Sequence, residues 1–204
     1  NLVSVTDALG NETKYEYDQN KRLISTTDRT GAVTEYEYDG LGNVTKVTRP
    51  TGGISTTEYD HNGKVISSTD ALGFTEERTY DGNGNLKTVT DRRGNTTEYF
   101  YDADNRLVKV IDALDGVTTY TYDAIGQVIA VTNAREYTST IEYDADHRIV
   151  TESNPLAEEG SDIHRVKYRY DEMGRVLEKT NEDGTSVIYE YDANGNIIKY
   201  GDVT

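Results

Sequence analysis

Residues 80–101 read YDGNGNLKTVTDRRGNTTEYFY, and this stretch contains one complete unit of a repeat that runs along the chain. The dipeptide Tyr-Asp occurs nine times in the 204 residues, and seven of the eight intervals between its tyrosines are 21 residues long. The exception is the interval from Tyr143 to Tyr170, which is 27 residues long. A fixed period of this length indicates one small structural unit copied along the chain. The nine pairs are Tyr17-Asp18, Tyr38-Asp39, Tyr59-Asp60, Tyr80-Asp81, Tyr101-Asp102, Tyr122-Asp123, Tyr143-Asp144, Tyr170-Asp171 and Tyr191-Asp192.

Each repeat contains two sequences that are typical of tight turns. In the quoted unit these are residues 81–85 and residues 91–94. An aspartate that begins a turn can accept a hydrogen bond from the backbone N–H two residues later. A glycine at the fourth position supplies the positive φ that such a turn needs. Lys21, Asn105 and His147 replace this glycine in three of the Tyr-Asp turns, and lysine is the poorest of the three substitutes.

Two strand-like runs lie between the turns. The run before the Tyr-Asp pair reads T-x-Y-x-Y in several repeats, as in Thr34–Tyr38 and Thr118–Tyr122, so that alternation places both tyrosines on one face. The run after each pair carries an apolar residue six positions beyond the tyrosine: Leu23, Val44, Val65, Leu86, Leu107, Val128, Ile149, Val176 and Ile197.

The sequence therefore predicts an all-β fold built from tandem 21-residue β-hairpins. Short turns of this kind join antiparallel neighbours, so the hairpins should form one long antiparallel strip. Sheets of this width twist and usually curl. We treat residues 1–204 as a single array of nine Tyr-Asp units, and we expect it to be an excerpt of a longer repeat region because Asn1-Leu2 matches Asn43-Val44 inside a repeat.

The longer interval marks an insertion. Residues 151–165 include Asn154-Pro155, Glu158-Glu159-Gly160 and Asp162, a composition that predicts an enlarged turn. Neutral variation in length and a functional loop are the two interpretations of this segment.

Composition restricts the class of protein. Leu, Ile, Val and Phe make up only 41 of 204 residues, but 17 tyrosines and a strict period argue against disorder. The formal net charge of −16 disfavours nucleic acid and anionic membranes as partners. There is no cysteine, and no apolar run approaches the ~20 residues of a membrane span. We expect an extended sheet whose stability depends on contacts between neighbouring repeats.

At these residues the chain resembles the RHS/YD-repeat family. The family pattern, Y-x-Y-D-x-x-G-N-L-x-x-x-T-D-x-x-G, is almost complete from Tyr36 to Thr48 and recurs from Tyr189 to Ile197. The family includes bacterial RHS and wall-associated polymorphic toxins, the BC component of insecticidal Tc toxins, and animal teneurins. The resemblance implies a hairpin strip that spirals into a hollow shell, which encloses a C-terminal effector in bacterial members and belongs to an adhesion module in teneurins.

Other features of the family are missing from the printed sequence. We find no Asp-Pro-x-Gly-Leu core sequence after the last repeat, no toxin domain and no N-terminal plug. The resemblance therefore implies shell material and implies no toxic activity for these residues.

No set of residues predicts a catalytic, cofactor-binding or metal-binding site. The runs from Asp81 and Asp192 resemble the start of an EF-hand loop, but Arg92 and Val203 stand where that loop needs its bidentate glutamate. None of the histidines, His61, His147 and His164, accompanies a nucleophile motif. Asn-x-Thr sequons begin at Asn11, Asn43 and Asn95.

The leading hypothesis is a non-enzymatic segment of an RHS/YD shell around a tethered effector. Its partners would be the rest of the same shell and that effector, and unpaired edge strands predict edge-to-edge self-association. The alternative is an extracellular or cell-surface binding module, with the tyrosine row or the insertion as a surface for a glycan or protein. In either case we expect a secreted or cell-surface protein of bacterial origin without a cofactor, although no signal segment is present in the sequence.

Overall fold

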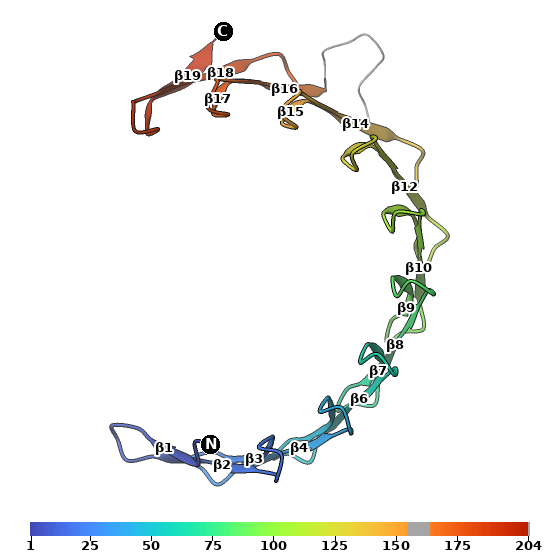
Figure 1. The fold of residues 1–204 in the computed structure, drawn as a ribbon, viewed down its shortest axis with the longest axis vertical. Helices are drawn as coiled ribbons and strands as arrows, with labels where there is room; N and C mark the ends of the chain where they lie inside the picture. Colours follow the sequence, from blue (N-terminus) through green and yellow to red (C-terminus); the bar gives the residue numbers. More distant parts are fainter. Residues whose placement is uncertain (155–163, 204) are drawn as a thin grey trace. The chain divides into compact units, whose positions relative to one another are not determined.

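The computed structural model describes residues 1–154 and 164–203, and these residues form β-strands joined by short turns. Throughout these two ranges the chain contains no helix. The strands belong to a 19-stranded antiparallel sheet, which confirms the all-β prediction (Figure 1). By its contacts the chain divides into two compact parts, Asn1–Glu98 and Tyr99–Thr204.

In the first part, consecutive strands pair antiparallel along the chain. The tenth strand of the sheet begins in this part, where its first residues pair with the ninth strand, and it ends in the second part. The bounds are β1 (Ser4–Thr6), β2 (Glu12–Tyr17), β3 (Leu23–Thr27), β4 (Val33–Tyr38), β5 (Val44–Thr48), β6 (Ile54–Tyr59), β7 (Val65–Thr69), β8 (Thr75–Tyr80), β9 (Leu86–Thr90) and β10 (Thr96–Tyr101).

The second part repeats the same arrangement. Within each part, the described pairings join only neighbours in sequence, so each part is an open sheet in which no late strand returns to an early one. The remaining bounds are β11 (Leu107–Ile111), β12 (Val117–Tyr122), β13 (Val128–Thr132), β14 (Thr138–Tyr143), β15 (Ile149–Ser153), β16 (Arg165–Tyr170), β17 (Val176–Thr180), β18 (Ser186–Tyr191) and β19 (Ile197–Val203).

The two faces of the sheet differ as the alternation predicts. In β4 the half-buried residues are Thr34, Tyr36 and Tyr38, whereas the residues that alternate with them, Val33, Glu35 and Glu37, are exposed. We call the face that carries the tyrosines the tyrosine face. The opposite face holds cross-strand polar pairs such as Lys46 with Glu37, whose Nζ and Oε1 atoms lie 2.7 Å apart.

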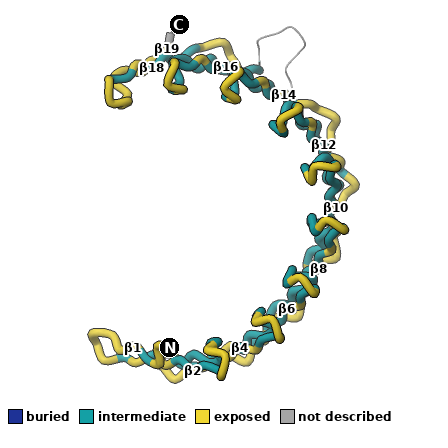
Figure 2. Tube along the Cα trace, viewed as in Figure 1, coloured by how far each residue is buried: buried dark blue, intermediate teal, exposed yellow. Residues whose placement is uncertain are grey.

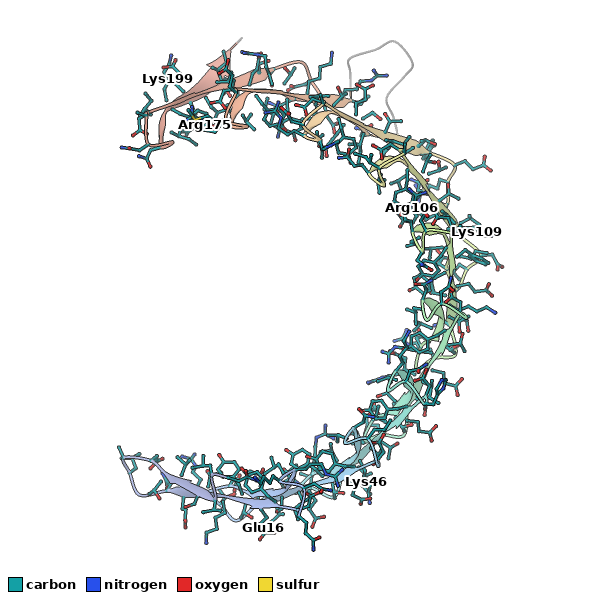
Figure 3. The ribbon with its side chains drawn as sticks, in the orientation of Figure 1. Glu16, Lys46, Arg106, Lys109, Arg175 and Lys199 are labelled. Carbon is teal, nitrogen blue, oxygen red and sulfur yellow. The ribbon has the colours of Figure 1, made fainter. Side chains whose placement is uncertain are left out.

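Figure 3 shows the division between the faces at the level of single side chains. Arg106 and Lys109 are only three residues apart, yet they extend to opposite faces of the strip. Arg106 reaches the ring of Tyr122 on the tyrosine face, whereas the Lys109 ammonium covers the ring of Phe100 at 3.9 Å.

Both turns of the repeat have the same construction. In the turn at Asp18, the N–H of Lys21 donates to the Asp18 carbonyl at 3.0 Å, and the N–H of Asp18 donates to the Arg22 carbonyl at 2.9 Å. Lys21 has a φ of 66°, in the left-handed region. A type I turn followed by one left-handed residue is a common three-residue hairpin connection. The turns from Asp7, Asp28 and their equivalents repeat these two hydrogen bonds, so the predicted type I geometry is confirmed.

The Tyr-Asp end of each hairpin also carries a β-bulge. Tyr17 pairs with Leu23, but Glu16 pairs with Ser25, so Ile24 is an extra residue on its strand. The same register shift recurs beside Tyr38, Tyr59 and Tyr80, and again in the second part. A bulge bends its strand and increases the local twist. In every described pairing of this kind, the apolar residue six positions after the tyrosine is therefore its cross-strand partner.

The sheet has no conventional core. Among the described residues no side chain is fully buried, and half-buried residues alternate with exposed turns along the strip (Figure 2). Because a single layer of strands can cover only part of each side chain, stability must come from contacts between adjacent strands and adjacent repeats.

The predicted enlarged turn is shorter than residues 151–165. Thr151 to Ser153 complete β15 and Arg165 begins β16, because the ladder continues from Thr151 paired with Lys167 to Ser153 paired with Arg165. The prediction was wrong at both ends of this range. The N–H of Asn154 donates to the His164 carbonyl at 2.8 Å, which closes the base of the connection. Pro155, Glu158-Glu159-Gly160 and Asp162 lie outside the described residues.

Candidate functional site

The tyrosine of a Tyr-Asp pair joins its own repeat to the preceding one at seven described positions. The hydroxyl of Tyr38 donates a hydrogen bond to the main-chain carbonyl of Leu23 at 2.6 Å. Leu23 is the cross-strand partner of Tyr17, so two consecutive Tyr-Asp tyrosines meet at one apolar residue. The same bond links Tyr59 to Val44, Tyr80 to Val65, Tyr122 to Leu107, Tyr143 to Val128, Tyr170 to Ile149 and Tyr191 to Val176, at 2.7–2.9 Å.

The position of the receiving carbonyl explains this bond. The pairing of β3 with β4 runs from Ser25 to Thr27, so Leu23 lies beyond the paired segment on that side. A main-chain carbonyl without a partner is costly when it is partly covered. The phenol of Tyr38 crosses from the neighbouring strand and supplies a donor, so the tyrosine continues the connection between β3 and β4 beyond the end of their ladder.

The aspartate of each pair organises its own turn. One oxygen of Asp39, Oδ1, accepts hydrogen bonds from the backbone N–H groups of Leu41 and Asn43, each at 2.9 Å. The other oxygen, Oδ2, accepts from the Asn43 side-chain amide at 2.9 Å. These hydrogen bonds favour the ionised carboxylate, and they hold the pKa of Asp39 below the ordinary value of 3.8. The pKa values of Asp18, Asp60, Asp81, Asp102, Asp144, Asp171 and Asp192 are lowered as well.

A third residue of the repeat lies five positions after the tyrosine. In the repeats where this residue is arginine, it connects successive Tyr-Asp turns. The Arg22 Nε donates to Asp18 Oδ2 at 2.7 Å, and its Nη1 donates to the Asp39 carbonyl of the next turn at 3.0 Å. Its guanidinium carbon lies 4.8 Å from the centre of the Tyr38 ring, a cation–π contact. The same three contacts recur at Arg106, Arg148 and Arg175.

Asparagine, lysine and glutamine at this fifth position make fewer of these three contacts than arginine does. Asn43 and Asn196 donate to the second oxygen of their own aspartate. Lys64 places its ammonium 4.8 Å from the Tyr80 ring centre and donates to the Gly84 carbonyl. Gln127 donates from Nε2 to the His147 carbonyl at 3.2 Å. The strength of the connection between turns therefore varies along the chain with one side chain per repeat.

Sequence reasoning missed this fifth-position residue. It also treated the tyrosines as a packing row and gave no role to their hydroxyls. The available signal was a long or amide-bearing polar residue at one fixed place in every repeat, where neither turn chemistry nor alternation requires one.

The remaining candidates from the sequence, two histidines and the sequon asparagines, lie in the turns of the repeat. His147 adopts a φ of 65° in its turn, where glycine is usual, and His61 follows Asp60 in another. The amide nitrogens of the sequon residues Asn11, Asn43 and Asn95 each donate to a turn aspartate at 2.8–2.9 Å. In the part of the chain that the structure describes, no group of three or more His, Cys, Asp or Glu side chains could hold a metal ion.

This constellation of turn, bulge and tyrosine repeats at the residues that a family model recognises. The model described as RHS repeat matches residues 1–32, 17–54, 59–97, 80–116, 101–136, 122–159 and 170–203. The chain belongs to the RHS repeat family. The resemblance inferred from the sequence is therefore confirmed.

Solved structures show the same fold. The RHS chain is similar to a chain in the crystal structure of TcdB2-TccC3-TEV, with 18% identity, a TM-score of 0.70, and coverage of 98% of this chain and 12% of that one. It is also similar to a chain of TcdB2-TccC3 without its hypervariable C-terminal region, with 14% identity, a TM-score of 0.60, and coverage of 98% and 15%. The chain therefore spans less than a sixth of these neighbours.

Two further comparisons complete the description. Among curated proteins, none is similar enough to count as a relative. Over residues 1–154 and 164–203, the structure includes no helix with the length and apolar character needed to cross a membrane.

Proposed function

We propose that this RHS chain is a wall segment of a shell that encloses a polypeptide effector, and that it has no catalytic role of its own. The observation that carries this proposal is the recurring hydrogen bond from a Tyr-Asp tyrosine to the preceding repeat, which the structure describes for seven of these tyrosines. These bonds commit the most regular residues of the sequence to holding strands together. The function then belongs to the surface that the repeats build and not to a single pocket.

The physical logic of a wall is separation of its contents from solvent and protease. A hairpin strip held by contacts between neighbours can be extended by adding repeats, because each repeat contacts only the ones beside it. The similar TcdB2-TccC3 chains are several times longer than this chain, which supports a role as one section of a larger assembly. The curl of the strip, its hollow interior, and a secreted or cell-surface location are parts of this proposal.

The alternative function is a binding module for a glycan or protein. One observation favours it: a second row of half-buried tyrosines on the tyrosine face, Tyr15, Tyr36, Tyr99, Tyr120 and Tyr189. The Tyr-Asp tyrosines suit this role poorly, because arginine or lysine covers the rings of Tyr38, Tyr80, Tyr122, Tyr170 and Tyr191. A sugar ring needs an open aromatic face to stack on.

Electron microscopy of the natural full-length chain separates the two functions. We expect density for a closed wall of hairpins with polypeptide density inside it. An open strip with no enclosed density would overturn the shell proposal, and a glycan array that is positive with the same chain would then support the binding module.

A further inference from the structure

The chain uses its own arginines to fill a recurring site between consecutive Tyr-Asp turns. At the joint between the turns of Asp102 and Asp123, the Arg106 Nε donates to Asp102 Oδ2 at 2.7 Å and its Nη1 lies 3.4 Å from the Asp123 carbonyl. The guanidinium carbon lies 4.9 Å from the Tyr122 ring centre. The site thus has three elements: the carboxylate of one turn, the aspartate carbonyl of the next turn, and the ring of the tyrosine that precedes it.

The following joint, between the turns of Asp123 and Asp144, has the same three elements but no arginine. Gln127 stands at the fifth position, and its amide is directed to the next turn's fourth residue. Its Nε2 donates to the His147 carbonyl at 3.2 Å, and its Oε1 lies 3.2 Å from His147 Nδ1. Glutamine therefore leaves the three elements unbridged.

Each of the three elements at this joint has an acceptor atom or a ring face that no described residue occupies. Asp123 Oδ1 accepts from the N–H groups of Ile125 and Gln127, whereas no described residue donates to its Oδ2. Among the described contacts the Asp144 carbonyl accepts only the N–H of His147, so one lone pair is available. No arginine or lysine of the described residues covers the Tyr143 ring, in contrast to the ring of Tyr122.

An open hollow of about 610 Å³ lies at this joint. Asp123, Gln127, Ile129, Ile141, Tyr143 and Asp144 are among the residues that line it. Ile129 and Ile141 supply apolar walls beside the ring, where the stem of a long side chain could pack. The hollow therefore combines one carboxylate, one carbonyl with an available lone pair and an aromatic face in the arrangement that holds a guanidinium at the joint before it.

We propose that this hollow binds an arginine side chain of a polypeptide partner. The guanidinium bridges the Asp123 carboxylate and the Asp144 carbonyl and stacks on the Tyr143 ring. The formal net charge of −16 favours a cationic partner over an anionic one.

Geometry selects arginine over lysine. The Lys64 ammonium, at its own joint, covers the Tyr80 ring and donates to the carbonyl of Gly84, the fourth residue of the next turn. At the proposed site the equivalent carbonyl belongs to His147 and is already used by Gln127. The two acceptors that remain are the ones that a forked, planar guanidinium joins in this chain and that a single ammonium does not.

A titration with a blocked amino acid tests the proposal. N-acetyl-arginine amide is added to the ¹⁵N-labelled chain, and backbone amide shifts are followed. We expect saturable shifts confined to the residues around Gln127, Tyr143 and Asp144, with a dissociation constant in the millimolar range because one exposed ion pair and one cation–π contact are weak. N-acetyl-lysine amide should bind at least about fivefold more weakly, and N-acetyl-citrulline amide, which has the shape without the charge, should not bind.

Two variants decide the assignment. Gln127→Arg supplies the guanidinium from the chain itself, and we expect it to reduce binding of the arginine probe by about tenfold or more. Arg106→Gln opens the preceding joint, and we expect a second set of saturable shifts around Asp123. Unchanged titration of Gln127→Arg, equal affinity for the lysine probe, or shifts scattered over all turns would overturn the proposal, and the first of these does not depend on how well Arg106→Gln folds.

Discussion

The hydroxyl of Tyr38 lies 2.6 Å from the main-chain oxygen of Leu23, the residue that is paired with the tyrosine of the preceding repeat. One side chain thereby joins two hairpins and satisfies a carbonyl that lies beyond the end of the ladder between β3 and β4. This relationship recurs along both parts of the chain, and it gives a structural role to the tyrosine that precedes the aspartate in the Tyr-Asp turns.

Removal of one such hydroxyl should weaken the joint between two repeats. We expect Tyr59→Phe to lower the free energy of unfolding by about 1 kcal/mol, because it removes the hydrogen bond to the Val44 carbonyl and keeps the ring. Tyr36→Phe is the matched control, since its hydroxyl makes no hydrogen bond to any described residue. Urea unfolding measures both. Equal losses in the two variants would show that the hydroxyl bond contributes nothing specific.

The left-handed position of the turn predicts opposite effects for two substitutions. Gly42 has a φ of 93°, and alanine there should cost about 1–2 kcal/mol. Lys21 already occupies the same position with a φ of 66°, so Lys21→Gly should stabilise the chain, by up to about 1 kcal/mol.

Gly40 provides the control for this pair. Its φ is not in the left-handed region, and a Cβ placed there meets no atom within 4 Å. Thermal unfolding of Gly40→Ala should therefore differ little from that of the parent chain. A destabilised Lys21→Gly variant would contradict the assignment of strain to this position.

The turn carboxylates predict loss of stability in acid. Hydrogen bonds from Arg22 and Asn43 lower the pKa values of Asp18 and Asp39 below 3.8 in the folded chain. For a carboxyl group with a lowered folded pKa, the stabilisation is fully present above the unfolded value and is lost as the pH falls through the folded value. Eight of the Tyr-Asp aspartates have lowered pKa values, so these small effects add up.

The expected profile has two regimes. Between pH 7 and the ordinary aspartate value of 3.8, the decline of the −16 charge relieves repulsion and stability changes little or rises. Below pH 3.8 the stability of the folded chain falls steeply. Urea midpoints measured across this range give the profile, and stability that continues to rise below 3.8 would contradict the role of the turn aspartates.

Arginine at the fifth position should strengthen the joint that it bridges. Arg22→Met keeps the stem but removes the contacts with Asp18, the Tyr38 ring and the Asp39 carbonyl, and we expect a loss of about 1–2 kcal/mol. Arg29→Met is the control, because Arg29 is exposed and its side chain makes no described hydrogen bond. Amide exchange in the turn of Asp39 should become faster only in Arg22→Met, and the same increase in both variants would refute a specific link.

Local chemistry explains how much of the fold was predictable. Asp and Gly at fixed spacing specify the turns, and the alternation around Tyr36 and Tyr38 specifies the faces, so strands, turns and repeat were all predicted from the sequence. The bond from Tyr38 to Leu23 joins residues 15 positions apart, and periodicity does not reveal which carbonyl lacks a partner. That information depends on the bulge at Ile24, which has no sequence signature of its own.

At two places the structure departs from what the local sequence favours, namely at Lys21 and at the end of β15. Lys21 is unfavourable in a left-handed conformation, yet the hydrogen bonds of its turn hold it there. The sequence around Asn154-Pro155 suggested a turn from Thr151, but cross-strand pairing extends β15 to Ser153 despite the nearby proline. At Lys21 the hydrogen bonds of the turn outweigh the preference of the residue, and at β15 the pairing with β16 does.

We propose that these tyrosine-linked repeats form a closed wall around a polypeptide. Limited proteolysis of the natural full-length chain tests it most directly, by comparing the parent with a variant that carries Tyr38→Phe, Tyr59→Phe, Tyr122→Phe and Tyr143→Phe. We predict that the enclosed segment survives in the parent and is digested faster in the variant, in step with the loosened repeats. Equal and rapid digestion of that segment in both proteins, while the repeats themselves remain intact, would contradict the account.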